Sequence, residues 1–307
     1  MAYLTPCCDY AYIDSEAKLD EQTKMKFSQN IYSPGSPVYE TWQQFFSYRR
    51  RPNAFILVYN DQHGTPQIFG KKKTAHQKGL IMFEGNVGIF LTYSVPKFPK
   101  LNTINFEESG KAQHLLGFNI DLEGLAILSE HLWRTPPMIR YINVPEEFKR
   151  IGQIGQISAG KFSNDNDENY YKSDFKTVGG LEFKIFTRTN SEKMNRKSNS
   201  IFADLYDEFG QSFTVQTWLS GAKVCCVYGI KNSTKTRIRV LRLRPGACKQ
   251  WSTGSDHSKV GLSENFEIVI FCDLNNTITV NFRGGSIYVF ENALLAAVIK
   301  NTFEHCV

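Results

Sequence analysis

The sequence has no long apolar run, and this excludes one class of protein at once. Its longest apolar stretches lie near residues 54 and 268 and are far shorter than the roughly 20 residues that a membrane-spanning helix needs. We therefore expect no membrane span. The 307 residues are 41% hydrophobic and 21% charged, so the chain can bury a core and is not globally disordered. A net charge of +6 permits an anionic partner without requiring one.

Sequence patterns for metal and nucleotide binding are missing too. The seven cysteines include no C-x-x-C pair, and no Cys/His cluster has the spacing of zinc ligands. The P-loop, the dinucleotide fingerprint, the G-x-S-x-G elbow and the H-E-x-x-H motif are all absent. We therefore expect no metal site and no cofactor. The pairing of any disulfides is left open by the sequence.

What the sequence does contain is an alternation of strand and helix patterns. In the first part of the chain, hydrophobic periodicity predicts helices over 38–48 and 123–133 and strands over 54–59, 79–83 and 87–94. In the second part it predicts helices over 200–209 and 292–303 and strands over 223–230, 237–243, 266–272, 277–282 and 286–290. Such a mixture indicates an α/β or α+β protein with a sizeable sheet.

Polar segments suggest how the chain is divided. We expect an irregular N-terminal lead-in over 1–37, a first half over 38–152, a polar loop or linker over 153–177 and a second half over 178–307. No short-period repeat interrupts this division.

Histidine is scarce, yet two of the six histidines open the same tripeptide, His-x-Lys. His76 and Lys78 form the first copy and His257 and Lys259 the second, one in each half of the chain. On an extended segment residues i and i+2 point to the same face, so each tripeptide directs an imidazole and an ammonium into one space. If the halves pack face to face, two imidazoles and two ammoniums converge. The alternative is that both tripeptides are solvated pairs in surface loops.

That set of side chains suits phosphodiester chemistry without a metal ion. One neutral histidine attacks phosphorus, the other, protonated, gives its proton to the leaving oxygen, and the lysines stabilise the phosphoryl charge. The imidazoles of His76 and His257 should then face each other across a cleft, about one phosphate apart.

Further strings around the two tripeptides resemble consecutive blocks of the deoxyribonuclease II family. They are Tyr59-Asn-Asp-Gln62, Ala75-His-Gln-Lys-Gly79, Leu91-Thr-Tyr-Ser-Val-Pro-Lys-Phe-Pro99, Asp204-Leu-Tyr206, Val215-Gln-Thr-Trp218, Asp256-His-Ser-Lys259, Asp273-Leu-Asn275 and Arg283-Gly-Gly285. The order and spacing of the blocks are retained across residues 38–300. The Ser-Val-Pro-Lys-Phe-Pro and Asp-His-Ser-Lys strings are the most specific of them.

The resemblance implies an α/β fold like that of phospholipase D. In such a pseudo-dimer two similar halves, each with a mixed β-sheet flanked by helices, carry one motif each and form the site between them. It also implies metal-independent, endonucleolytic cleavage of DNA at acid pH through a phosphohistidine intermediate, leaving 3′-phosphate ends. Carried over by position, the catalytic residues are His76, Lys78, His257 and Lys259. Which histidine becomes phosphorylated is left open.

Six further side chains are candidate substrate contacts: Lys71, Lys72, Lys73, Tyr93, Asp273 and Arg283. The lysine run lies just before the first tripeptide and is placed to draw in a DNA backbone, although a solvated loop fits it equally well. Asp273, like Glu84, follows a motif and either orients a catalytic group or serves in a turn. The remaining histidines (His63, His114, His131 and His305) lack a matching context, and we interpret them as structural.

The chain also departs from the family pattern. The family usually has Gly and Thr where this chain has Ala75 and Gln77, and it has a third histidine where this chain has Tyr93. A catalytically silent relative that binds nucleic acid or a protein partner is therefore the alternative function. The resemblance implies a lysosomal or secreted protein, but no signal peptide pattern opens this sequence, so an intracellular location stays open. The sequence does not indicate an oligomeric state.

Overall fold

The computed structural model of the protein describes most of the chain. The described residues are 1–4, 9–15, 17–20, 25–28, 30–61, 74–97, 101, 103, 110–163, 170–189, 201–218, 230–232, 238–241, 248–249, 253–277 and 283–305. Within these ranges no helix is long and apolar enough to cross a membrane. The strands expected over 223–230 and 277–282 fall almost entirely outside the described residues, as do Lys71, Lys72 and Lys73.

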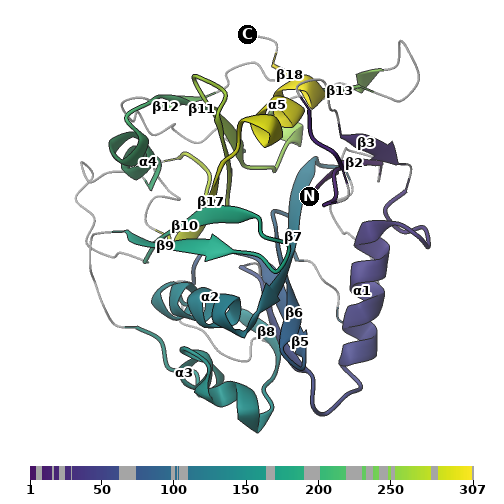
Figure 1. The fold of residues 1–307 in the computed structure, drawn as a ribbon, viewed down its shortest axis with the longest axis vertical. Coiled ribbons are helices and arrows are strands. Elements are labelled where there is room, and N and C mark those ends of the chain that lie inside the picture. The colour runs from purple at the N-terminus through teal and green to yellow at the C-terminus, as the bar shows by residue number, and fades with distance from the viewer. Residues whose placement is uncertain are drawn as a thin grey trace.

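The helices and strands belong to two large sheets and one small one (Figure 1). The helices are α1 (Pro37–Tyr48), α2 (Leu122–Arg134), α3 (Ile154–Ser158), α4 (Ile201–Phe209) and α5 (Ala293–Thr302), with 3₁₀ turns η1 (Glu146–Arg150) and η2 (Thr253–Ser255). The first sheet has the order β3 (Lys26–Ser28), β2 (Tyr10–Tyr12), β1 (Ala2–Leu4), β7 (Gln113–Asp121), β6 (Val87–Tyr93), β5 (Gly79–Glu84), β4 (Phe55–Tyr59), β8 (Ile139–Asn143). The second has the order β12 (Ile230–Asn232), β11 (Phe213–Gln216), β15 (Val260–Ser263), β16 (Ile268–Cys272), β17 (Gly285–Glu291), β10 (Glu182–Arg188), β9 (Tyr171–Lys176). The small sheet consists of β14 (Cys248–Lys249), β13 (Ile238–Leu241) and β18 (Phe303–His305).

The two large sheets repeat one arrangement. In chain order, α1, β4, β5, β6, β7 and α2 of the first half correspond to α4, β11, β15, β16, β17 and α5 of the second. The spatial order is also the same, β7-β6-β5-β4 in one sheet and β17-β16-β15-β11 in the other. In both halves a His-x-Lys tripeptide stands directly before the strand that opens a hairpin, β5 or β15. The protein is therefore an α/β protein of two similar halves with a phospholipase D-like fold.

The helix predictions are confirmed, with small shifts at the ends that capping explains. Helix α1 begins at Pro37 because the Ser36 side chain accepts a hydrogen bond from the N–H of Tyr39. Helix α2 begins at Leu122 because the carboxylate of Asp121 accepts a hydrogen bond from Gly124. The sheets differ in one detail: a parallel pair, β11 with β12, makes the second sheet mixed, whereas the described pairs of the first sheet are antiparallel.

The expectation of an irregular segment over 1–37 is wrong for three short stretches, which form strands, whereas residues 13–15, 17–20 and 30–36 have no regular structure. Strand β1 pairs with β7, β2 with β1, and β3 with β2, all antiparallel, so they extend the first sheet. The pairing buries the rings of Tyr3 and Tyr10 almost completely. Three-residue strands are too short to show an alternation in sequence, and their stability comes from the partner strand and not from local propensity.

The polar stretch 153–177 is likewise not a loop throughout. It contains α3, which packs beside α2 in the same hydrophobic cluster, and β9, which pairs with β10 in the second sheet. In β9 the exposed lysine and aspartate side chains alternate with Tyr171, Ser173 and the buried Phe175. An edge strand with one face exposed to solvent carries few apolar residues, and its sequence is therefore mostly polar.

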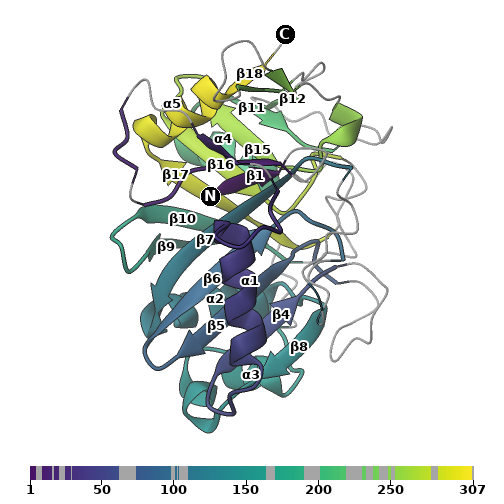
Figure 2. The same ribbon diagram turned by 90° about the vertical axis from the view of Figure 1, so that its right-hand side faces the viewer.

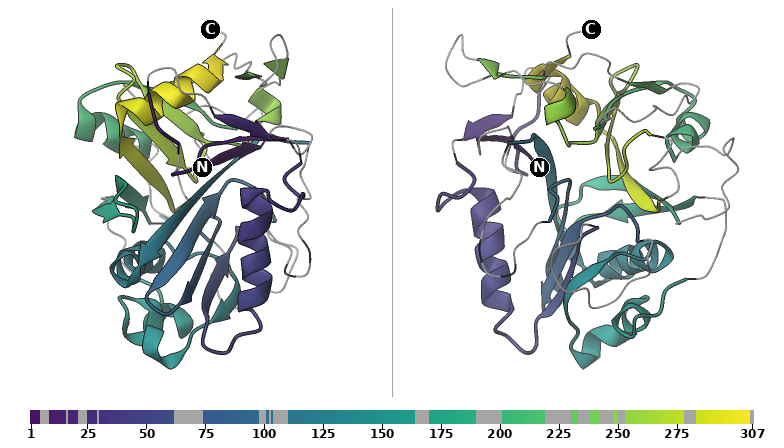
Figure 3. Two further views of the ribbon diagram at one scale, coloured as in Figure 1. Left: turned by 45° about the vertical axis from the view of Figure 1, so that its right-hand side comes forward. Right: turned by 180° about the vertical axis from the view of Figure 1, so that it is seen from behind.

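Packing of the elements produces layers (Figures 1 and 3). Helix α1 covers the outer face of the first sheet through Val38, Trp42 and Phe45. Helix α4 covers the outer face of the second sheet through a similar apolar stripe. The inner faces of both sheets, together with α2, α3 and α5, share one large core. Figure 2 shows β1 at the junction of the two halves.

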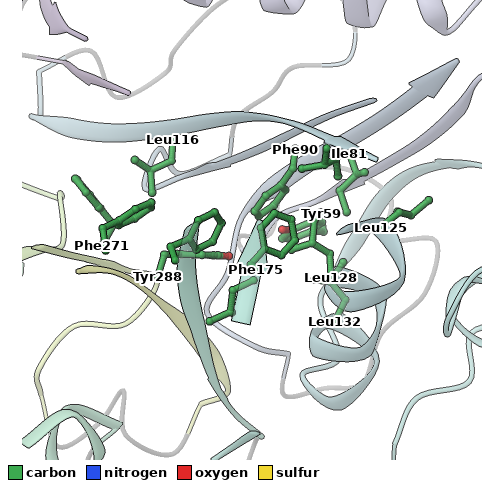
Figure 4. Close-up of a cluster of buried hydrophobic side chains, with 14 of the residues drawn as sticks. Tyr59, Ile81, Phe90, Leu116, Leu125, Leu128, Leu132, Phe175, Phe271 and Tyr288 are labelled. Carbon is green, nitrogen blue, oxygen red and sulfur yellow. The ribbon is translucent and has the colours of Figure 1, made fainter. Parts of the chain in front are cut away.

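Aromatic rings join the halves across this shared core. Figure 4 shows Tyr59 and Phe90 from the first sheet on the same cluster as Phe175 and Tyr288 from the second. The ring centroids of Phe90 and Tyr288 are 5.9 Å apart, within the range of favourable aromatic pairs. A continuous apolar interface of this kind fixes the two halves, and hence the two tripeptides, relative to one another.

Candidate active site

The first tripeptide lies directly before the start of β5, an internal strand of the first sheet, and its side chains alternate in direction. The Nε2 atom of His76 is 3.5 Å from Oδ2 of Asp61, and Nζ of Lys78 is 2.5 Å from Oδ1 of the same carboxylate. The Gln77 amide instead donates to the backbone oxygen of Thr135, at 2.6 Å, at the end of α2. The i, i+2 spacing thus places the imidazole and the ammonium on one side, and the family departure at Gln77 faces away from them.

Gly79, the residue after the first tripeptide, is fixed by close packing. A Cβ atom there would lie 2.2 Å from the hydroxyl oxygen of Tyr59 and 2.9 Å from the backbone oxygen of Leu91. A glycine therefore lets β5 approach β4 and β6 at the point where the tripeptide leaves the sheet.

Asp61 is the carboxylate on which the first tripeptide converges. It follows β4 directly and is buried, with its side chain only 2% exposed. Burial by itself raises the pKa of Asp61, but Lys78, His76 and Arg283 outweigh burial and hold the pKa well below its ordinary 3.8. Asp61 thus remains ionised in mild acid and neutralises part of the local positive charge.

Arg283, a predicted substrate contact, binds the segment that carries the first tripeptide. Its Nη1 atom is 3.1 Å from Oδ2 of Asp61. Its Nε and Nη2 atoms donate to the backbone oxygen of Thr74, and Nη2 also donates to that of Ala75, each at 3.2 Å. A residue that follows the second motif in sequence therefore holds the first motif in place. These contacts fit a planar guanidinium better than they would fit an ammonium.

His76 is anchored to the second half by two hydrogen bonds. Its backbone N–H donates to the oxygen of Gly284 at 2.7 Å, and its Nδ1 lies 2.6 Å from the backbone oxygen of Asp273. A carbonyl oxygen only accepts, so Nδ1 carries the hydrogen and Nε2 keeps the lone pair of the neutral ring. Burial, and then the charge of Lys78, lower the pKa of His76 to about 3, although Asp61 acts in the opposite direction.

The second tripeptide alternates in the same way as the first. Asp256 and Ser258 face the first sheet, where the hydroxyl of Tyr3 donates to Oδ2 of Asp256 at 2.5 Å and lies 2.8 Å from Oγ of Ser258. The backbone N–H of His257 donates to the oxygen of Ala112, the residue before β7, at 2.8 Å. Strand alternation then directs the side chains of His257 and Lys259 to the opposite side.

The environment of His257 and Lys259 is buried and positive. The ring of His257 lies against the indole of Trp218, with centroids 4.2 Å apart. Burial, and then Lys259, lower the pKa of His257 to about 3. Burial, and then Lys78 of the other tripeptide, lower the pKa of Lys259 to about 8, so this ammonium stays protonated in acid.

Asp273 is a buried carboxyl beside these cations. Its Oδ2 accepts a hydrogen bond from the backbone N–H of Ser286 at 3.0 Å, while its own backbone oxygen orients His76. Burial raises the pKa of Asp273 to about 7, although the Ser286 N–H and the lysines act in the opposite direction. Its position supports an orienting role for its backbone rather than a role in a simple turn.

The two tripeptides lie within electrostatic reach of each other. The charge of Lys259 acts on His76, and the charge of Lys78 acts on His257. That the two imidazoles face each other about one phosphate apart stays a prediction.

Of two other candidates from the sequence, Tyr93 borders this cluster, since its backbone N–H donates to the oxygen of Lys78 at 3.3 Å, and Glu84 lies apart from it. Tyr93 is buried on the α1 side, edge-on to Trp42 at 6.5 Å, and its hydroxyl is hydrogen-bonded to Asn60, the residue before Asp61. Glu84 forms an exposed ion pair with Arg51 at the far end of β5. In the described part of the chain, no group of three or more His, Cys, Asp and Glu side chains is arranged to hold a metal ion.

Three residues of the cluster were missed by sequence reasoning. Asp61 and Trp218 stand in strings that carry the family resemblance, and this was the available signal. His114, which we interpreted as structural, is buried on β7, and its Nδ1 lies 3.1 Å from the backbone N of Lys259. Nothing in the sequence near position 114 indicates that contact, because the second motif is far away along the chain.

The fold and this cluster define a class: a two-half α/β protein with a phospholipase D-like fold and one histidine–lysine tripeptide before a strand of each half. The family model of Deoxyribonuclease II matches residues 5–307. The chain therefore belongs to the deoxyribonuclease II family and is a nuclease, that is, a phosphodiester hydrolase.

Individual relatives are distant but match along most of the chain. It is 24% identical to Cell-death-related nuclease 7 of Caenorhabditis elegans, and the matched region covers 92% of this chain and 75% of the relative. It is also 24% identical to a Putative deoxyribonuclease-2 of Burkholderia pseudomallei, with 96% and 82% covered. Identity to Deoxyribonuclease-2 of C. elegans is 24%, with 83% and 73% covered.

Proposed function

We propose that the protein is an acid endodeoxyribonuclease that works without a metal ion, with His76 as the nucleophile and His257 as the proton donor. The observation that carries the proposal is the joining of one His-x-Lys tripeptide from each half into a single buried, positively charged cluster. Hydrogen bonds link the two tripeptides through β16: the Nδ1 atom of His76 lies 2.6 Å from the backbone oxygen of Asp273, and the backbone N–H of the adjacent Cys272 donates to the oxygen of Lys259 at 3.0 Å. A phosphodiester anion is the ligand that such a cluster attracts.

The assignment of His76 as nucleophile follows from its tautomer. Its Nδ1–H is held by the backbone oxygen of Asp273, so the lone pair is on Nε2 and the ring orientation is fixed. A pKa of about 3 keeps the ring neutral in the acid range. Attack forms a bond from Nε2 to phosphorus and breaks the bond from phosphorus to the leaving oxygen of DNA.

His257 completes the step as a general acid. The free protein holds its pKa at about 3, and the negative charge of a bound phosphodiester raises that pKa because it favours the imidazolium. The imidazolium gives its proton to the leaving oxygen. Neutral His257 then takes a proton from water, which attacks phosphorus, breaks the bond to Nε2 and frees His76.

Charge stabilisation comes from side chains already in place. Lys78 and Lys259 are both at most 3% exposed, and protonated ammoniums next to the site stabilise the negative phosphoryl oxygens. The oxygens of Asp61 are occupied by Lys78 and Arg283, which leaves the carboxylate poorly suited to bind a metal ion. We infer 3′-phosphate ends from the family resemblance, so the leaving oxygen is the 5′ oxygen.

The roles of the two histidines are separable with an activated substrate. Thymidine 3′-(4-nitrophenyl phosphate) releases 4-nitrophenolate, which needs no proton from the enzyme. His257→Ala should therefore release a burst of about one nitrophenolate per site and then stall as the phosphohistidine, because the second step lacks its base. His76→Ala should give no burst. Neither variant should nick DNA.

The same experiment has clear contrary outcomes. A burst from His76→Ala with none from His257→Ala would exchange the two roles. Wild-type turnover of both substrates by both variants would remove the site assignment altogether. Protein from the burst, denatured at alkaline pH where a phosphohistidine survives, should carry the 3′-phosphoryl nucleotide on His76, and its absence would exclude the covalent route.

A further inference from the structure

Strands β1 and β7 contact Asp256, Ser258 and Lys259 of the segment that carries the second tripeptide. Tyr3 on β1 is paired directly with His114 on β7, so the two side chains share one face of the first sheet. The Tyr3 hydroxyl contacts the side chains of Asp256 and Ser258. The Nδ1 atom of His114 accepts a hydrogen bond from the backbone N–H of Lys259 at 3.1 Å.

The main chain of Ala112, the residue before β7, continues this attachment. Ala112 accepts the N–H of His257 at 2.8 Å and donates to the oxygen of Ser255 at 2.8 Å, and it forms a parallel bridge with Asp256. His114 itself is fixed from behind, because Ser94 both donates to its backbone oxygen and accepts from its backbone N–H, each at 3.0 Å. The imidazole thus connects a rigid part of the first sheet to the second tripeptide.

We propose that His114 is a positioning residue of the active site, whose neutral imidazole accepts the Lys259 N–H and so places Lys259 opposite the first tripeptide. This inference rests on the proposed function. It assigns a role in the reaction to a histidine for which the sequence indicated only a structural one.

The ring must remain uncharged to do this. Nδ1 accepts a hydrogen bond from an N–H, so it holds the lone pair and the ring hydrogen is on Nε2. A second proton would have to sit on Nδ1 and would face the Lys259 N–H directly. Burial, and then the charges of Lys259 and Lys78, keep the pKa of His114 well below 6.5, so the ring stays neutral in mild acid.

Two substitutions at position 114 distinguish a role of the hydrogen-bond acceptor from a role of the ring in packing. His114→Phe keeps a ring of similar size next to Phe271, whose centroid is 5.7 Å away, but it has no acceptor. His114→Asn loses the ring but puts a side-chain oxygen near the position of Nδ1. If the acceptor is what matters, Phe should lower kcat for DNA nicking by about 10²-fold with little change in KM, since small misplacements of catalytic groups cost that much. Asn should recover most of the loss.

A double variant tests whether the effect passes through the second tripeptide. When Lys259→Ala has already removed the ammonium, adding His114→Phe should lower kcat by far less than it does in the wild type. Tyr3→Phe, which removes one hydroxyl from the same attachment, should lower kcat in the same direction. It provides an independent test if His114→Phe does not fold, which a thermal unfolding curve shows.

Three results would each overturn the proposal: wild-type kcat for both His114→Phe and Tyr3→Phe, an Asn variant as impaired as the Phe variant, or fully multiplicative losses in the double variant. Failure of the proposed function looks different. In that case His76→Ala and His257→Ala nick DNA like the wild type, whatever residue occupies position 114.

Discussion

Asp61→Asn is the substitution whose consequences the structure defines most closely. The change keeps the size of the side chain and removes one negative charge. It leaves the buried Lys78 and the one-third-exposed Arg283 next to His76 without the carboxylate that contacts all three. We expect losses in both stability and turnover, and a shift in the pH dependence of turnover.

The size of the stability loss follows from burial. The Asp61 and Lys78 side chains are 2% and 3% exposed, and removal of one partner from such a buried pair costs about 3–5 kcal/mol. The control is Glu84→Gln, which removes the partner of Arg51 from an ion pair whose side chains are 45% and 46% exposed. Exposed pairs contribute only about 0–1 kcal/mol.

The pH dependence has a defined sign. The pKa of Asp61 is lowered in the folded protein, so its stabilisation is fully present above its ordinary pKa of 3.8 and is lost only at lower pH. The difference in unfolding free energy between wild type and Asp61→Asn should therefore be constant between about pH 5 and 7. The carboxylate also raises the pKa of His76. Its removal lowers that pKa further, so the acid limb of the rate profile moves to lower pH.

Two assays measure these effects on the same samples. Urea unfolding gives the free energy of unfolding at each pH, and nicking of supercoiled plasmid gives the rate. We expect turnover of Asp61→Asn to fall by about 10²-fold because Lys78 loses its anchor. An unfolding free energy within about 1 kcal/mol of the Glu84→Gln control, together with an unchanged pH profile, would refute the reasoning.

Further predictions concern residues around the site. His131 is buried between two hydroxyls and has a pKa of about 3, so below about pH 6.5 the unfolded chain gains a proton that the native protein does not. His131→Asn should reduce the acid-side slope of stability by up to about 1.4 kcal/mol per pH unit, and an unchanged slope would contradict the assignment. Gly79→Ala should cost about 1–3 kcal/mol in urea unfolding because its Cβ meets the Tyr59 hydroxyl at 2.2 Å; a neutral change would mean that the strands part easily. Arg283→Lys keeps the charge near Asp61 but not the forked contacts to backbone oxygens, so kcat should fall while salt-dependent DNA binding is retained. A fall in DNA affinity alone would make Arg283 a substrate contact after all.

Much of the fold was predictable because its signals are local. The helices and the hairpin of β5 and β6 show their periodicity over enough residues to be recognised, and Gly85 at φ +71° marks the turn between those strands. Strands β7, β8, β10, β11 and β15 were not predicted. Nor were β1 to β3 and β9. Their stability comes from pairing with strands distant in sequence and, in β9, from a face that stays polar in solvent.

The site residues, like the strands, include some that a local sequence pattern predicts and some that it does not. The spacing of the tripeptides and the family strings led to His76, Lys78, His257 and Lys259, because i, i+2 alternation is a local property. Arg283 was predicted as a substrate contact. In the structure its guanidinium binds Asp61 and a backbone oxygen of the segment before His76. The roles of Asp61 and His114 depend on which groups the fold brings to them, and no local pattern encodes that.

The central claim is that paired histidines cleave DNA without a metal ion, and nicking of supercoiled plasmid in excess EDTA at roughly pH 5 tests it most directly. Wild type, His76→Ala and His257→Ala should be compared under identical conditions, with folding checked by thermal unfolding. The account predicts full activity of the wild type in EDTA and no nicking by either variant. Loss of wild-type activity in EDTA that magnesium or calcium restores would contradict it, as would equal nicking by all three proteins.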